Sequence, residues 1–285
     1  MGVAGLLSGK RALVMGVAND HSIAWGIARK LAEAGAEIAF TYQGEALRKR
    51  VGPLAASLGS DIVLPCDVEN EDSVKELFAA LREKWGTLDI LVHAIAYSDK
   101  SELKGRYADT SRANFSRTMI ISCFSFTEVA RAAAEMMPNG GAMVTLTYGG
   151  SVRVMPNYNV MGVAKAALEA SVRYLASDFG PRNIRVNAIS AGPVRTLAGA
   201  GIADARLMFN FQTRHAPLRR TVTIDEVGGA ALYLLSELGS GVTGEIHYVD
   251  SGYNIISMPQ PDALKVVDEA QTAAEQQEAP PRAAE

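Results

Sequence analysis

Two tyrosines and a lysine lie close together in the stretch YGGSVRVMPNYNVMGVAK, which runs from Tyr148 to Lys165. Seven residues turn an α-helix by about 700°, within roughly 20° of two full turns, so Tyr158 and Lys165 would share one helix face. A phenol with its ordinary pKa of about 10 donates a hydrogen bond at neutral pH, unless a nearby cation such as Lys165 favours its anion. The pair therefore predicts a hydroxyl that hydrogen-bonds a substrate. The alternative is an exposed pair on an amphipathic helix.

Short apolar runs that could hold these residues in place alternate with segments of helical period along the chain. The runs read RALVMGVA, AEIAFTY, DIVLPC, LDILVHAIA, GAMVTLT, IRVNAISA and EIHYVD. This alternation predicts an α/β fold, a Rossmann-like, doubly wound, seven-stranded parallel sheet with helices on both faces.

The runs continue from Arg11 to Asp250 without a Pro, Gly or Ser-rich linker, which predicts one domain over residues 1–260. Residues 193–220 form a connection that is long for this fold, and we expect them to include a substrate-binding loop. Residues 261–285 are rich in Ala, Glu, Gln and Pro and are expected to be a flexible tail.

Composition excludes several classes of protein. The 28 basic and 31 acidic residues give a net charge of −3, and no basic run suggests a nucleic-acid partner. Cys66 and Cys123 belong to no metal-binding pattern, so we expect buried free thiols and no metal site. A charged leader and an apolar stretch of membrane-spanning length are both missing, which predicts a cytoplasmic protein that does not enter a membrane.

A glycine turn follows the first predicted strand, in GVANDHSIAWGIARKLAEAG from Gly16 to Gly35. A glycine there lets the backbone approach a pyrophosphate, and the helix expected from about Ser22 would direct its N-H groups at the charge. The GxGxxG fingerprint is not present, because the next glycine is Gly26. An ordinary turn at Gly16 and an ordinary helix cap at Ser22 are therefore equally consistent with this segment.

The end of the second strand bears on which dinucleotide would bind. Thr41, Tyr42 and Gln43 occupy the place where an acidic residue usually meets the adenosine ribose, and the first cation beyond them is Arg48. Gln43 can hydrogen-bond a ribose hydroxyl, but no cation is placed to hold a 2'-phosphate. This favours NADH over NADPH.

Two further strand ends carry polar residues. Asp67 and Val68 follow the third strand, where the carboxylate would accept from the adenine amine; Asp67 as a plain cap of the next helix is the alternative. HAIAY, from His93 to Tyr97, follows the fourth strand and places small residues beside the cofactor. We expect His93 to be a structural histidine.

With these motifs in place, the chain resembles the short-chain dehydrogenase/reductase superfamily and, within it, the bacterial NADH-dependent enoyl-acyl-carrier-protein reductases. Most of the superfamily has Tyr and Lys in the spacing YxxxK, and that tyrosine position is Met161 here. The enoyl reductases instead have six residues between Tyr and Lys, as Tyr158 and Lys165 do, and a further tyrosine that matches Tyr148. The similarity spans residues 7–258 and includes GVANDHSIAWGIA, TYQ, CDV, RVNAISAGPVRTLA, RRTVTIDEVGGAALYLLS and TGEIHYVDSGYNI.

The resemblance implies a set of residues for each part of the site. The residues implied to bind the dinucleotide are Gly16, Ser22, Ile23, Gln43, Asp67, Val68, Ile95, Lys165, Val194, Arg195, Thr196, Leu197 and Ala198. The residues implied to bind the substrate are Tyr97, Ser98, Tyr148, Tyr158, Met161, Ala198, Ile202 and Met208. Many relatives have Ser and Gly where this chain has Ala94 and Ala96, a difference that would alter inhibitor or substrate fit without abolishing hydride transfer.

The implied activity is reduction of a trans-2-enoyl thioester on acyl carrier protein in bacterial fatty acid biosynthesis. Hydride from NADH would reach the β-carbon, and Tyr158 would stabilise the enolate oxygen. Tyr148 would position the substrate or deliver a proton, and Lys165 would hold the nicotinamide ribose. We expect the loop LAGAGIADARLMF to become ordered over cofactor and acyl chain.

The resemblance also implies partners. The helices expected around residues 114–137 and 163–179 would pack between the subunits of a homotetramer. Four arginines would form a landing site for acidic carrier protein, or would be scattered solvated side chains; they are Arg206, Arg214, Arg219 and Arg220.

Two other functions stay open on the residues alone. One is an alcohol or ketone reductase of the same superfamily, which Met161 and the long Tyr to Lys spacing disfavour. The other is a dinucleotide-binding regulatory protein without turnover, which the joint presence of Tyr148, Tyr158 and Lys165 disfavours.

Overall fold

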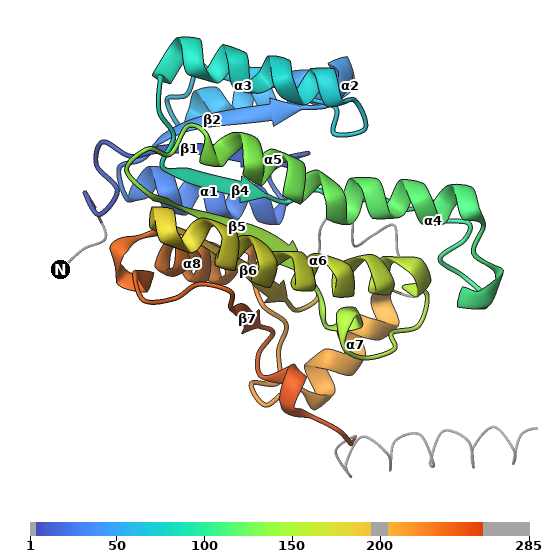
Figure 1. The fold of residues 1–285 in the computed structure, drawn as a ribbon. Coiled ribbons are helices and arrows are strands. Elements are labelled where there is room, and N and C mark those ends of the chain that lie inside the picture. The colour runs from blue at the N-terminus through green and yellow to red at the C-terminus, as the bar shows by residue number, and fades with distance from the viewer. Residues whose placement is uncertain (1–3, 195–204, 259–285) are drawn as a thin grey trace, which may run out of the picture.

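A seven-stranded parallel sheet forms the centre of the protein (Figure 1). The structure, a computed structural model, describes residues 4–194 and 205–258, without the side chains of residues 205 and 206. The strand order is β3-β2-β1-β4-β5-β6-β7. The strands are β1 (Arg11–Met15), β2 (Glu37–Tyr42), β3 (Val63–Pro65), β4 (Ile90–His93), β5 (Gly141–Thr147), β6 (Ile184–Ala191) and β7 (Ile246–Val249). The predicted fold class is confirmed, and each predicted strand lies within its apolar run.

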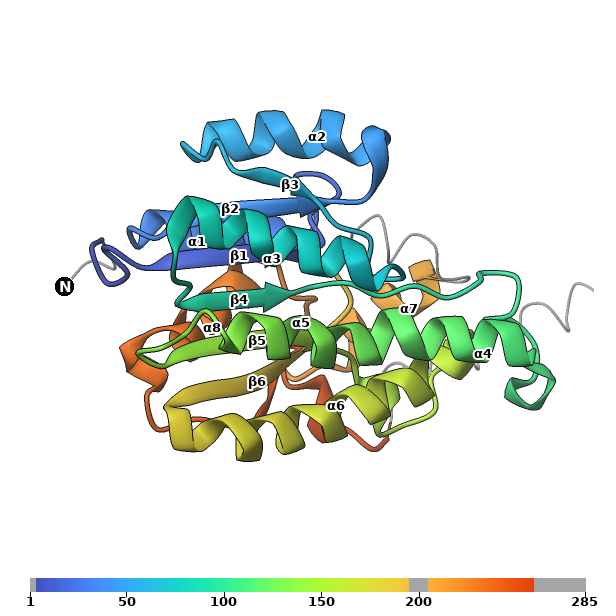
Figure 2. The same cartoon turned by 45° about the horizontal axis from the view of Figure 1, so that its top comes forward.

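Helices cover both faces of the sheet and bury a separate apolar layer on each side. One layer contains α1 (Ile23–Glu33), α2 (Gly44–Ser57) and α8 (Ile224–Leu235); the other contains α3 (Glu71–Trp85), α5 (Ser125–Ala134) and α6 (Asn159–Phe179). Figure 2 shows α5 and α6 side by side in front of the strands. Strands buried on both faces need continuous apolar runs, which is the pattern that the sequence has.

The carboxyl ends of the strands form the edge where the predicted site residues gather. β1 pairs with both β2 and β4, so the chain winds in opposite directions from the centre of the sheet. Ligands of open α/β sheets bind in the crevice at such a switch point. Two helices, α4 (Arg112–Met119) and α7 (Ala205–His215), lie beyond this edge (Figure 1). α7 occupies part of the connection that we described as a loop.

A π-helical turn, Ile120–Phe124, joins α4 to α5 inside the segment expected as a single helix over residues 114–137. The turn carries Ser122, and Ser125 begins the helix after it; both side chains are fully buried. Ser122 contacts the chain that follows β4, and Ser125 contacts His93 at the end of β4. π-Turns often occur at functional sites, and this one directs two hydroxyls at the carboxyl edge of the sheet.

Two glycines hold the first and last helices of one layer together. A Cβ at Gly26 in α1 would lie 2.4 Å from the carbonyl oxygen of Ile224, and one at Gly228 in α8 would lie 2.6 Å from the carbonyl oxygen of Gly26. Gly26 therefore permits close helix packing and is not a second phosphate-turn glycine. Within the described residues, no helix has both the length and the apolar character needed to cross a membrane. The predicted tail, 261–285, lies outside the described residues.

Candidate active site

The turn after β1 requires glycine at its first position. Gly16 has φ 98°, and a Cβ there would lie 2.1 Å from the carbonyl oxygen of Ala94 at the end of β4. A side chain would break this contact, so Gly16 brings the turn directly against the switch point. The ordinary-turn interpretation of Gly16 does not account for that approach.

Ser22 organises this turn from within. Its Oγ accepts hydrogen bonds from the backbone N-H groups of Ala18, at 3.0 Å, and Asn19, at 3.1 Å. It makes no capping bond to α1, although it is the residue before the helix, so the ordinary-cap interpretation is wrong. The first turn, which begins at Ile23, therefore keeps N-H groups for an anion, as a pyrophosphate site requires.

The next two strand ends form the side expected to hold adenosine. Gln43 is exposed directly after β2, and Arg48 pairs with Glu45 at 3.4 Å. Asp67 follows β3, and its Oδ1 accepts from the N-H of Glu69 at 3.0 Å. Asn70 caps α3, so the cap alternative for Asp67 is excluded and its carboxylate shapes the loop at the sheet edge. Val68, beside it, is buried.

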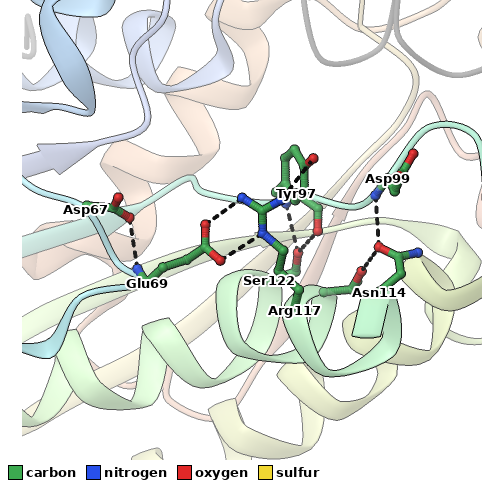
Figure 3. Close-up of polar contacts among 8 residues, drawn as sticks. Asp67, Glu69, Tyr97, Asp99, Asn114, Arg117 and Ser122 are labelled. Carbon is green, nitrogen blue, oxygen red and sulfur yellow. Dashed lines mark hydrogen bonds and ion pairs between the residues drawn. The ribbon is translucent and has the colours of Figure 1, made fainter. Parts of the chain in front are cut away.

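The chain after β4 is fastened to α4 and the π-turn, as Figure 3 shows for Tyr97 and Ser122. The N-H of Tyr97 donates to Ser122 Oγ and the Ser122 hydroxyl donates to the Tyr97 carbonyl, both at 2.9 Å. Ser98 is buried, and Thr118 donates to its Oγ at 2.9 Å. The Ser98 side chain is therefore engaged by α4. Ile95 is half-buried and comes just before these hydrogen-bonded residues.

His93 is a structural histidine, as predicted. Its Nδ1 lies 3.2 Å from Thr145 Oγ1 and its Nε2 lies 2.9 Å from Ser125 Oγ. Burial, and then the charge of Lys165, lower the pKa of His93 to about 3. The ring is neutral and shuttles no proton at neutral pH.

Tyr148 and Tyr158 form an aromatic pair at the start of α6, the helix that carries Lys165. The two rings meet edge to face with centroids 5.2 Å apart. α6 begins one residue after Tyr158, so the shared-face argument is inexact: Tyr158 occupies the N-cap position and only Lys165 is helical. Both side chains are nevertheless buried, and Lys165 Nζ donates to the Leu146 carbonyl at 2.8 Å. The structure therefore excludes the exposed-pair alternative.

The protonation states follow from this burial. Burial is the main cause that raises the pKa of Tyr158 and of Tyr148, so both are neutral hydrogen-bond donors. Burial lowers the pKa of Lys165 to about 8, while Cys123 and Glu169 act in the opposite direction. Lys165 is thus mainly charged at neutral pH but close to titration.

Two glycines leave the space in which the Tyr158 ring packs. A Cβ at Gly150 would lie 2.4 Å from Tyr158 Cδ1, and one at Gly162 would lie 2.7 Å from the Gly150 carbonyl oxygen. Sequence reasoning missed both, although the GG pair after Tyr148 was a visible signal. Met161 is buried in one apolar cluster with Tyr158. It fills the YxxxK tyrosine position with a side chain that has no hydroxyl.

Other functional residues were also missed. Glu169 is buried one helical turn after Lys165 and accepts from Thr147 Oγ1 at 2.7 Å. The spacing of four residues between Lys165 and Glu169 on a helix was the available signal. Asn114 and Arg117 in α4 hold the chain after β4, and a sequence pattern alone gives no sign of that contact.

The remaining predicted positions lie around the same edge. Val194 is half-buried after β6, and Met208 is half-buried on α7. Five predicted residues lie outside the described part of the chain: Arg195, Thr196, Leu197, Ala198 and Ile202. Residues 4–194 and 205–258 contain no group of three His, Cys, Asp or Glu side chains arranged to bind a metal.

Comparison with known proteins agrees with this geometry. A family described as enoyl-(acyl carrier protein) reductase matches residues 16–254. Enoyl-(acyl-carrier-protein) reductase (NADH) 2 of Rhizobium meliloti (strain 1021) is 72% identical over 264 residues, which cover 93% of this chain and 98% of the relative. Reductase (NADH) 1 of the same organism is 62% identical over 259 residues, covering 91% and 95% of the two chains.

Solved structures show the same likeness. FabI from Candidatus Liberibacter asiaticus superposes with a TM-score of 0.89 at 60% identity, over 90% of this chain and all of that one (100%). A reductase from Anaplasma phagocytophilum in complex with NAD superposes with a TM-score of 0.88 at 56% identity, over 90% and 98% of the two chains. The chain belongs to the enoyl-(acyl carrier protein) reductase family.

Proposed function

We propose that this protein reduces the trans-2 double bond of enoyl thioesters on acyl carrier protein with NADH, in the elongation cycle of bacterial fatty acid biosynthesis. The observation that carries the proposal is the position of the Tyr158 phenol. It is buried and neutral at the N-cap of α6, the helix that carries the buried Lys165, at the sheet edge where a dinucleotide binds. The family match and the NADH-dependent relatives support the same chemistry.

The residues along the edge fit NADH. Gly16 and the uncapped start of α1 suit a pyrophosphate, Gln43 suits a ribose hydroxyl, and Asp67 with Val68 suits adenine. The cation closest in sequence to Gln43, Arg48, is exposed and paired with Glu45, which leaves a 2'-phosphate without a dedicated partner. Bound NADH supplies the hydride that is added to the β-carbon of the substrate.

Tyr158 stabilises the charge that this addition creates. Negative charge develops on the thioester oxygen, and the Tyr158 hydroxyl donates a hydrogen bond to it. A phenol whose pKa is raised by burial stays protonated through the reaction and acts as a donor. Because the Tyr158 hydroxyl makes no hydrogen bond to any described residue, it is available to the substrate. The α-carbon then receives a proton, in a step that we assign to the Tyr148 side of the pocket.

The position of the tyrosine accounts for the reaction type. A ketone reductase protonates the oxygen on the carbon that receives hydride, whereas an enoyl reductase must reach an oxygen two atoms further along the conjugated chain. Moving the tyrosine by three residues, about 4.5 Å along a helix axis, suits this longer reach. Met161, at the position used by ketone reductases, cannot donate a hydrogen bond, which disfavours that second function.

Lys165 holds the nicotinamide end of the cofactor in this proposal. Its ammonium group already donates to the Leu146 carbonyl, which fixes the side chain, and its other N-H groups can meet ribose hydroxyls. Glu169, one turn further along, favours the charged form. The lysine would therefore position the nicotinamide ring next to Tyr158. Holding the two groups close together lowers the barrier independently of the chemistry of the substrate.

The acyl chain would lie among the apolar residues beside Tyr158. Met161 is buried with Tyr158 in one cluster, and Met208 is half-buried on α7 beyond the sheet edge. We assign Tyr97 to the same pocket, together with Ala198 and Ile202, which lie outside the described residues. An apolar wall with few polar groups is what an acyl chain requires.

We also propose that the protein is a homotetramer that accepts substrate from acyl carrier protein in the cytoplasm. The solvent-facing apolar side chains of Ile120, Phe124 and Tyr174, on the two helices expected at the subunit contact, support the oligomer. The buried free thiols, with the pKa of Cys66 raised to about 12, support a reducing compartment. Of the four predicted arginines, Arg220 is paired with Glu226 and the side chain of Arg206 lies outside the described residues, so we assign Arg214 and Arg219 to the carrier protein.

One assay tests the function. Purified protein should consume NADH with crotonyl-CoA but not with simple ketones, and Lys165→Ala should lose most of this activity. Reduction of ketones alone would replace the proposal by the carbonyl reductase, and NADH binding without turnover of either substrate would replace it by the regulatory protein.

A further inference from the structure

A bidentate ion pair joins the loop after β3 to α4. Arg117 in α4 donates from Nε to Glu69 Oε1 and from Nη2 to Glu69 Oε2, both at 2.8 Å (Figure 3). Two parallel bonds of this kind fix the direction of the guanidinium plane as well as its distance. Arg117 therefore has a defined orientation although its side chain is 49% exposed.

The same guanidinium also lies over the ring of Tyr97. Its carbon is 4.4 Å from the ring centroid, and Nη1 is 3.4 Å from the phenol oxygen. Ser122 holds the Tyr97 backbone from both its N-H and its carbonyl, so the remaining freedom of this residue is in its side chain. Stacking of Tyr97 on a guanidinium that Glu69 keeps in place removes that freedom.

The two ends of this contact lie at different parts of the proposed site. Glu69 donates its N-H to Asp67, the residue that we place at adenine, whereas Tyr97 is at the proposed acyl pocket. We propose that Arg117 is a positioning residue that couples the two ends: cofactor binding orders the loop at Asp67, and Glu69 and Arg117 then fix Tyr97 for the acyl substrate. This inference rests on the proposed function, because it uses the assigned positions of adenine and acyl chain.

Stability alone does not explain the ion pair. Most exposed ion pairs contribute little to folding, and although a bidentate pair contributes more, stability would need only Glu69 and not the stacking of the same guanidinium on Tyr97. A coupling role needs only that each ligand binds better when the other has already ordered the shared contacts, and the effect must be reciprocal. The arrangement in Figure 3 meets that condition, because one cation contacts a residue from each loop.

The experiment measures the binding of crotonyl-CoA by calorimetry with and without saturating NAD⁺, an oxidised cofactor that cannot reduce the ligand. In the unaltered protein NAD⁺ should tighten the binding at least about fivefold, the lower end of common coupling factors. Arg117→Met and Glu69→Gln should each reduce this factor to less than half. Arg112→Met, an exposed arginine of the same helix, is the matched control and should leave the factor unchanged.

Three results would overturn the inference: no tightening by NAD⁺ in the unaltered protein, a factor in Arg117→Met or Glu69→Gln that is at least half the original, or an equal loss in Arg112→Met. Glu69→Gln keeps the shape of its side chain, so it gives the answer if Arg117→Met does not fold. Turnover of crotonyl-CoA with NADH in the unaltered protein is measured in parallel. Turnover with an unchanged factor refutes the positioning role alone, whereas absent turnover refutes the proposed function.

Discussion

Replacing Tyr158 with Phe removes one hydroxyl and leaves the surrounding structure in place. The ring is 8% exposed, meets Tyr148 edge to face and sits on Gly150, and all of these contacts involve carbon atoms that Phe keeps. Because no described residue hydrogen-bonds the hydroxyl, its loss leaves no buried partner unsatisfied. The free energy of unfolding should therefore change by less than about 0.5 kcal/mol.

The effect on catalysis should be much larger. Removing a donor to a developing oxyanion raises the barrier by about 2.7 to 4 kcal/mol, which corresponds to a kcat about 100-fold to 1000-fold lower. The rate is measured as loss of NADH absorbance with crotonyl-CoA at saturation. Tyr107→Phe is the matched control, because Tyr107 is 48% exposed and belongs to no part of the proposed site.

Thermal unfolding followed by circular dichroism checks that Tyr158→Phe is folded. A folded variant whose kcat stays within about threefold of the original would refute the assignment of Tyr158 as the oxyanion donor. In that case the donor would have to come from another group at the same edge, and Tyr148→Phe would be the next variant to measure.

Three further predictions follow from the site and its surroundings. Because burial lowers the pKa of Lys165 to about 8, its charge is present below that pH and lost above it, so kcat/KM should fall as the pH rises through about 8. Lys165→Arg stays charged, so its pH profile should not show this decrease. A flat profile up to about pH 9.5 in the unaltered protein would contradict the role of the charge. Gly16→Ala should lose NADH binding, measured by calorimetry, because its Cβ would overlap a backbone carbonyl. Gly59→Ala, which has a similar positive φ but open space around it, should bind NADH normally. Equal binding by both variants would show that the turn at Gly16 is not tightly packed. Charge reversal of Arg214 and Arg219 together should raise KM about tenfold for substrate on carrier protein and leave KM for crotonyl-CoA unchanged, and an equal change for both substrates would refute the landing site.

Periodicity predicted the sheet because a parallel strand buried on both faces needs an uninterrupted apolar run. Each of the seven runs became a strand, down to the short β3 (Val63–Pro65). The helix α7 (Ala205–His215) in the long connection was missed, because the small, apolar and glycine residues before it led us to predict a loop for the whole connection. The π-turn was missed because one extra residue in a helix leaves its apolar pattern nearly unchanged.

Roles of single polar residues were harder to predict. Ser22 and Asp67 each had two interpretations, because a helix cap and a cofactor contact need the same residue types; the hydrogen bonds that their side-chain oxygens accept exclude the cap in both cases. The structural role of His93 was predicted, but its partners Thr145 and Ser125 come from distant elements. The ion pair between Glu69 and Arg117 joins residues 48 positions apart, and a single sequence does not show that two such distant residues are in contact.

The contact between α1 and α8 bears on how the chain is made. Arg29 in α1 pairs with Asp225 at the start of α8, 196 residues later, next to the point where the two helices meet through Gly26 and Gly228. During synthesis the first helix therefore emerges from the ribosome long before its partner exists, with the apolar side of α1 uncovered. Contacts of such long sequence separation slow folding and expose the nascent chain to aggregation. The half of the protein made first is thus completed by the half made last, and chaperones have their longest interval of access to the helix that begins the cofactor site.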